Sequence, residues 1–145
     1  MMTDDELIEK VFMPVYERVQ RHAPALKAYQ ERCSNSGIEG WLKVEAVAEL
    51  TETMEKVEVN NKGPDLKLNS GDQLIELKAE TGFSRSSIRG GNKYGVPCLF
   101  LCDGSPRNRE KIQKDATIRV VILEGFPKGT DDWLLGIAIP VSEPL

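Results

Sequence analysis

The chain contains few of the residues that build several common kinds of functional site. Its only histidine is His22, which excludes a histidine-rich zinc site and leaves a Ser-His-Asp triad dependent on that single residue. It has three cysteines, Cys33, Cys98 and Cys102. An odd and sparse set of cysteines is not a disulfide framework, so the sequence favours a reducing compartment, the cytoplasm.

Long apolar runs are also missing. No stretch approaches the roughly 18–20 apolar residues that a membrane span requires, and the opening residues, MMTDDE, are too acidic for a signal or transit peptide. We therefore expect a cytoplasmic protein with no membrane partner. The formal net charge of -4 argues against a uniformly basic surface that coats nucleic acid, although a basic cleft can sit on an acidic molecule.

Length and composition are typical of one packed domain. The chain has 145 residues, of which 40% are hydrophobic and 29% are charged, and soluble domains usually run to roughly 100–200 residues. We expect a single domain over residues 1–145. Within it, residues 1–36 should form an N-terminal helical extension and residues 37–145 the core.

Helical patterns dominate the first part of the chain. Aliphatic residues recur every four positions over residues 7–19, a stripe typical of a helix, and Pro14 should kink or restart that helix. Residues 38–54 are rich in Ala, Leu, Glu and Lys and contain no proline, so they predict the best-formed helix. Ser36 and Glu39 have the spacing of a capping box at its start.

The rest of the chain has the patterns of strands. Alternating or continuously apolar segments predict strands at residues 57–59, 65–68, 73–79, 96–102, 118–123 and 133–139, with one helix over residues 105–114. The order is helices, then a hairpin, then strand–helix–strand–strand. That order predicts a mixed α/β domain in which helices flank a central sheet.

The hairpin brings two acids together. If residues 69–72 form the turn, Leu68 faces Gln73 and, further back along both strands, Asp65 faces Glu76. Directly opposed side chains of an antiparallel pair have Cβ atoms about 4.5–5.5 Å apart. Two carboxylates that close repel each other, so we expect a cation between them or a proton on one of them.

Lys78 lies two residues after Glu76 and therefore projects from the same face of the strand. Asp65, Glu76 and Lys78 would then form one compact group. Two carboxylates with open positions suit Mg²⁺ or Mn²⁺, an ion that can activate water and clamp a phosphate oxygen. A lysine beside it can orient that water or stabilise charge that develops on phosphorus. The chemistry that this group implies is phosphodiester hydrolysis.

These residues carry a family resemblance. Pro64-Asp65, followed after ten residues by Glu76-Leu77-Lys78, resembles the signature of the PD-(D/E)XK nuclease superfamily, which includes restriction endonucleases and Holliday junction resolvases. The resemblance implies a restriction endonuclease-like fold and a Mg²⁺-dependent deoxyribonuclease that acts on duplex or branched DNA. It assigns Asp65 and Glu76 as metal ligands, the main-chain carbonyl of Leu77 as a third, and Lys78 as the residue that positions or activates water.

Members of this superfamily often add a glutamate from the helix before the motif strands. Glu45 is the best match for that position, because on a helix it falls between Trp41 and Leu42 on a largely apolar sector. Buried carboxylates normally have partners, so a carboxylate in that sector is unusual. Glu49 lies on the same stripe and is an open alternative.

A basic, glycine-rich segment follows the motif. Arg85, Ser86, Arg89 and Lys93 are interspersed with glycines over residues 80–95, a composition that suits close approach to DNA phosphates. The family usually has a well-formed helix at this place, and the glycines do not favour one.

One site cuts one strand, so cleavage of both strands or of a junction predicts a homodimer. Two alternatives remain open. The chain could be a catalytically silent nuclease-fold module that binds DNA or a protein partner, or a small interaction protein whose hairpin resembles the motif by accident.

Overall fold

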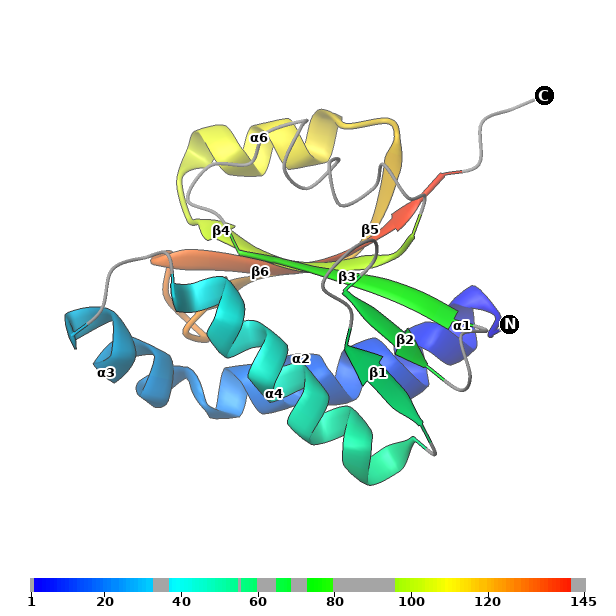
Figure 1. The fold of residues 1–145 in the computed structure, drawn as a ribbon. Coiled ribbons are helices and arrows are strands. Elements are labelled where there is room, and N and C mark those ends of the chain that lie inside the picture. The colour runs from blue at the N-terminus through cyan, green and yellow to red at the C-terminus, as the bar shows by residue number, and fades with distance from the viewer. Residues whose placement is uncertain are drawn as a thin grey trace.

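The computed structural model describes residues 2–32, 37–54, 56–59, 65–68, 73–79 and 96–141. Its centre is a six-stranded sheet with the strand order β1-β2-β3-β4-β6-β5 (Figure 1). The strands are β1 (Val57–Val59), β2 (Leu66–Leu68), β3 (Gln73–Ala79), β4 (Cys98–Asp103), β5 (Ile118–Phe126) and β6 (Trp133–Pro140). β3 and β4 run parallel and the other neighbouring strands run antiparallel, which confirms the expected mixed α/β architecture.

Helices cover both faces of this sheet. They are α1 (Asp4–Leu7), the π-helical turn η1 (Ile8–Phe12), α2 (Met13–Arg21), α3 (Ala23–Arg32), α4 (Ile38–Thr53) and α6 (Pro106–Lys114). Figure 1 shows α2 and α4 on one side of the sheet and α6 on the other. Among the described helices, none is long and apolar enough to cross a membrane.

Two apolar layers hold the helices to the sheet. The larger layer joins α1–α4 to one face, and the smaller layer lies under α6 on the other face. β4 contributes to both, because its alternate residues point to opposite faces. Leu99 and Leu101 belong to the larger layer, whereas Cys98, Phe100 and Cys102 belong to the smaller one. This strand is therefore buried on both faces, as its continuous apolar sequence predicted.

The N-terminal helix is interrupted next to Pro14, as expected. Thr3 caps α1 by accepting a hydrogen bond from the N–H of Glu6 at 3.2 Å. Pro14 lies in the first turn of α2 and has no N–H to bond the carbonyl of Lys10. Lys10 lies within η1, the wider turn that absorbs this missing hydrogen bond.

α4 spans Ile38–Thr53 and matches the predicted helix closely. The capping box predicted at its start includes Ser36, which lies outside the described residues. The first described residue before the helix is Gly37, which has no side chain with which to cap it. The carboxylate of Glu39 is directed instead toward Lys78 of β3. This departure matters for the site because it places an acid beside the motif strand.

Gly136 of β6 lies so close to the ring of Phe100 that it leaves no room for a side chain. It pairs with Phe100 of β4, and a Cβ atom at residue 136 would lie 2.4 Å from Cζ of that fully buried ring. We expect Gly136→Ala to lower the free energy of unfolding by about 1–3 kcal/mol, because the ring has no space to retreat into. Urea unfolding followed by circular dichroism measures this loss.

Gly40→Ala is the matched control, since a Cβ atom at that exposed position in α4 would meet no atom within 4 Å. This change should be neutral or stabilise the fold by up to about 1 kcal/mol. Equal losses for both variants would contradict the packing described for Phe100.

Candidate active site

The paired strands β2 and β3 place the motif residues in the predicted register. Leu66 pairs with Ile75 and Leu68 with Gln73, so the next position along both strands sets Asp65 opposite Glu76. Both acids are buried: the exposed fraction is 9% for Asp65 and 4% for Glu76. The strand pairing therefore holds two carboxyl groups together where little water can screen them.

The two carboxyl groups are hydrogen-bonded to each other. Oδ2 of Asp65 also accepts a hydrogen bond from the main-chain N–H of Leu77 at 2.8 Å. Because the N–H and C=O of one strand residue point toward the same neighbouring strand, the carbonyl of Leu77 is directed to the β2 side as well. The carbonyl that the family resemblance names as a ligand is thus on the same side of β3 as Asp65.

The two acids of the pair differ in protonation state at neutral pH. Burial, together with the hydrogen bond and the negative charge of Asp65, raises the pKa of Glu76 to about 8. Burial also acts against ionisation of Asp65, but the hydrogen bonds from Glu76 and Leu77 and the ammonium of Lys43 keep the pKa of Asp65 below its usual value. At neutral pH Asp65 is the carboxylate and Glu76 is the acid that donates to it.

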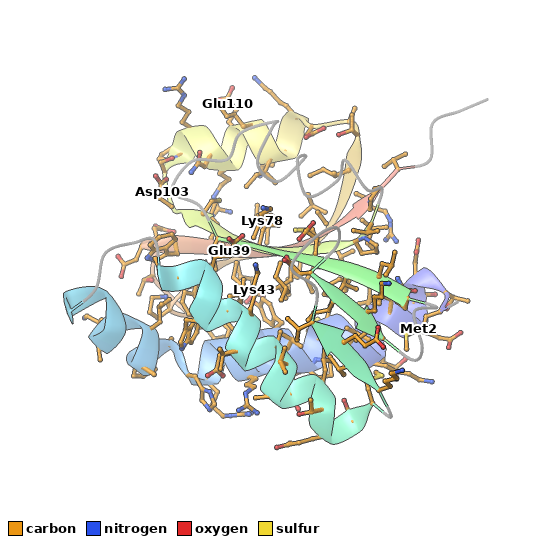
Figure 2. All side chains as sticks on the ribbon, viewed as in Figure 1. Met2, Glu39, Lys43, Lys78, Asp103 and Glu110 are labelled. Carbon is orange, nitrogen blue, oxygen red and sulfur yellow. The ribbon has the colours of Figure 1, made fainter. Side chains whose placement is uncertain are left out.

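Two lysines, Lys43 and Lys78, lie close to the pair of acids. Nζ of Lys43, on α4, lies 3.0 Å from Oδ1 of Asp65. Nζ of Lys78, on β3, lies 3.7 Å from Oε1 of Glu39, also on α4. Glu39 and Lys43 are four residues apart and so lie on one face of the helix. Figure 2 shows Glu39, Lys43 and Lys78 gathered where the N-terminal half of α4 meets β3.

Lys78 shares a sheet face with Glu76, as expected. In the parallel pairing of β3 with β4, Glu76 lies beside Cys98 and Lys78 beside Phe100. Cys98 and Phe100 belong to the apolar layer under α6. Glu76 and Lys78 therefore project from the face of the sheet that carries α6, and the apolar Ile75 and Leu77 point into the other layer.

The prediction for Glu45 is corrected by the structure. Its Oε2 accepts a hydrogen bond from Nε of Arg18 at 2.9 Å and lies 2.6 Å from Nδ1 of His22. Glu45 is two residues beyond Lys43, which is about 200° around the helix. It therefore faces α2 and the start of α3, away from Asp65. Its position in an apolar sector is explained by this polar cluster between helices.

Glu49, the open alternative, does not join the group either. It lies six residues beyond Lys43, about 9 Å further along α4 and about 240° around it. The helix acid that does reach the motif strand is Glu39, which sequence reasoning had used as a capping residue.

Lys43 was also missed, although the sequence held a signal for it. Two opposed carboxylates predict a cation nearby, and Lys43 is the only basic residue in α4. An acid and a base four residues apart, such as Glu39 and Lys43, are usually read as a solvent-exposed helix pair. The sequence pattern does not show that each of them pairs with the sheet instead.

Some predicted site residues fall outside the described part of the chain. These are Pro64 and the phosphate-contact candidates Arg85, Ser86, Arg89 and Lys93. Within the described ranges, no group of three or more His, Cys, Asp or Glu side chains could hold a metal ion. The ligands available there are the two carboxyl groups of Asp65 and Glu76 and the carbonyl of Leu77.

Comparisons of the chain with models of protein families, with curated proteins and with solved structures found no match.

The raised pKa of Glu76 predicts a pH dependence of stability. A carboxyl group whose pKa is higher in the folded state stabilises the fold fully below its unfolded value, about 4.5, and this contribution is lost as the pH rises through about 8. The lowered pKa of Asp65 acts only in more acidic solution. Between pH 5.5 and pH 8.5 in EDTA, we expect the unfolding free energy to fall by on the order of 2 kcal/mol.

Glu76→Gln keeps a neutral hydrogen-bond donor at this position, so its stability should lose most of that dependence. Glu58→Gln, on the neighbouring strand β1, is the control and should retain it. Urea unfolding at several pH values measures all three proteins. Parallel pH profiles for the wild type and Glu76→Gln would show that the two acids do not share a proton.

Proposed function

We propose that the chain is a Mg²⁺- or Mn²⁺-dependent deoxyribonuclease of the PD-(D/E)XK type, with a restriction endonuclease-like core. The observation that carries this proposal is the buried hydrogen-bonded pair of Asp65 and Glu76, with Lys78 on the same face of β3. The order of elements also supports it: the helix α4 precedes an antiparallel β1-β2-β3 unit, and β4 then returns parallel to β3.

The residues present fit a hard divalent cation. Mg²⁺ is usually held by one or two carboxylates and keeps several waters, so it does not require a third acid. The pair of Asp65 and Glu76 holds a proton that neither acid alone would keep at neutral pH, which marks a place where positive charge is favoured. Asp65, Glu76 and the carbonyl of Leu77 would hold the ion.

When bound, such an ion supplies Lewis-acid stabilisation of charge on a phosphate oxygen. Lys78 would donate hydrogen bonds to the attacking water or to the phosphate, and its charge would stabilise the transition state. Glu39 is a positioning residue in this proposal, because its carboxylate lies 3.7 Å from Nζ of Lys78 and restricts where that ammonium group points. The proton on Glu76 must leave before the acid can bind the ion.

One observation favours the second candidate, a catalytically silent module of the same fold. Lys43 places an ammonium 3.0 Å from Oδ1 of Asp65, where it partly neutralises the site without a metal ion. In a module that only binds DNA or a protein partner, this lysine would not interfere with function, because no metal ion has to bind Asp65. In an active nuclease, Lys43 must give way to the ion or share Asp65 with it.

Metal binding should release a proton and depend on both acids. Calorimetric titration with Mn²⁺ at pH 7, in two buffers of different ionisation enthalpy, should reveal release of close to one proton, since Glu76 is protonated in the free protein. Asp65→Asn should weaken binding at least about tenfold. Lys43→Gln should strengthen it, because the competing ammonium is gone.

Asp115→Asn, a change at the end of α6, is the control and should bind Mn²⁺ like the wild type. Binding without proton release would contradict the protonation state assigned to Glu76. Absence of binding in both the wild type and Lys43→Gln would remove the metal site from the proposal.

Cleavage should depend on Glu39 and not on Glu45. With Mg²⁺ and plasmid or branched DNA, we expect Lys78→Gln to lose at least about 100-fold in rate, in line with the loss of one transition-state donor. Glu39→Gln should lose less, about tenfold, and should shift the pH profile because it removes the negative charge of Glu39 beside Lys78.

Lys67→Gln, on the facing strand of the same hairpin, and Glu45→Gln, in the cluster with Arg18 and His22, are the controls and should still cleave. Metal binding without cleavage in the wild type would favour the silent module. Cleavage that survives both Asp65→Ala and Lys78→Gln would refute the site itself.

A further inference from the structure

The sheet ends in a long apolar strand, β5. This strand has nine residues, Ile118–Phe126, and it is the last in the strand order, paired on one side with β6. In the described part of the chain, no strand pairs with its outer side. Val120–Leu123 are all aliphatic and half-buried. A long apolar edge promotes aggregation unless another element covers it.

The backbone of β5 presents its free groups in a symmetric pattern. The N–H of Val141 donates to the carbonyl of Thr117 at 2.9 Å, so Thr117 faces β6. Because successive strand residues alternate in direction, Arg119 also faces β6, and Ile118 and Val120 direct their N–H and C=O groups outward. Pro140, which lies opposite Ile118 and has no N–H, agrees with this assignment.

The β-bulge at Val121 adds one residue to β5, so the alternation of inward and outward groups shifts by one position beyond it. The register shifts between Val120 and Ile122, so that Ile122 pairs with Ile137. Ile137 faces β5, since it lies two residues from Ile139, the partner of Arg119. Ile122 and Glu124 therefore face β6, and the outward groups beyond the bulge belong to Leu123 and Gly125.

The outward positions 118, 120, 123 and 125 are symmetric about the point between Val121 and Ile122. We propose that two copies of this chain pair along β5, antiparallel and about a two-fold axis, to form one continuous sheet. In that register Val120 exchanges main-chain hydrogen bonds with Leu123 of the partner subunit, and Ile118 does so with Gly125 of the partner subunit. The proposal does not depend on the nuclease activity proposed above.

The charges of the strand complement each other in the same register. Arg119 would lie directly opposite Glu124 of the partner subunit, in a pair without main-chain hydrogen bonds, where side chains approach closest. Both side chains are exposed in the single chain. Both also sit on the same face of the sheet, since Arg119 pairs with Asp4 of α1 and Glu124 accepts a hydrogen bond from Tyr16 of α2. The two-fold axis makes this contact twice.

On the opposite face, the edge borders a shallow hollow between β5 and α6. Its volume is about 380 Å³, and its lining is Ile112, Gln113, Asp115, Ile118, Val120 and Leu123. Val120 and Leu123 are the two residues that the proposed register brings against each other across the two-fold axis. The partner's aliphatic side chains would therefore extend this apolar surface and remove it from water.

Sedimentation velocity tests the proposal through charge reversal. The wild type should sediment with twice the chain mass of 16.2 kDa at roughly 10–100 μM, as expected for a symmetric dimer. Arg119→Glu places acids opposite acids and Glu124→Arg places bases opposite bases, so each variant alone should raise the dimer dissociation constant at least about tenfold. An equimolar mixture of the two should regain the dimer, because each chain then complements the other.

Lys128→Glu, an exposed charge reversal just beyond β5, is the control and should remain dimeric. Circular dichroism checks that each variant is folded. Should a charge variant fail to fold, Arg119→Cys combined with Glu124→Cys is the second test, since opposed cysteines in this register should form a disulfide-linked dimer, whereas Arg119→Cys alone should not. A monomeric wild type, a mixture that stays monomeric, or no cross-link would each overturn the proposal.

Discussion

The contact between Asp65 and Glu76 is the constraint on which the rest of the site depends. Leu66 and Ile75 fix it from the opposite face, because they are fully buried in the core and a slip of one residue would expose them and bury the acids in their place. The apolar layer thus forces two acids together that would otherwise separate. Three groups offset the repulsion between the acids: a shared proton, the N–H of Leu77 and the ammonium of Lys43.

A contact of the site could be predicted from the sequence only where its partners lie close together in the chain. The hairpin register followed from local alternation, and it placed Asp65 and Glu76 correctly. The assignment of Glu45 failed because a helical wheel shows that a carboxylate is buried without showing what buries it. Its partners, Arg18 and His22, come from helices far away in the sequence. Glu39 was misread for the same reason, since its capping pattern is local and its contact with Lys78 is not.

α4 contributes one residue to each of the two ion pairs beside the acids. One face of this helix carries Glu39 toward Lys78 and Lys43 toward Asp65, and one helical turn separates them. Any shift of α4 against the sheet would change both ion pairs together, so the helix sets the charge around the acids as a unit. The buried stripe of Ile38, Leu42, Ala46 and Leu50 resists such a shift. The same packing that stabilises the core therefore positions the lysines.

The proposed dimer and the proposed activity are independent, and the twist of the joined sheet would separate the two sites. Antiparallel pairing of identical strands has its two-fold axis perpendicular to the sheet where the two β5 strands meet, so the two copies would form one continuous sheet. Three strand spacings separate β3 from β5 in each copy. Seven spacings of about 4.8 Å would then separate the two β3 strands, roughly 34 Å across the joined sheet. Neighbouring strands twist by roughly 20–25°, so over seven spacings the face that carries Glu76 and Lys78 would turn by about 140–175°, and a straight duplex bound at one site would not reach the other.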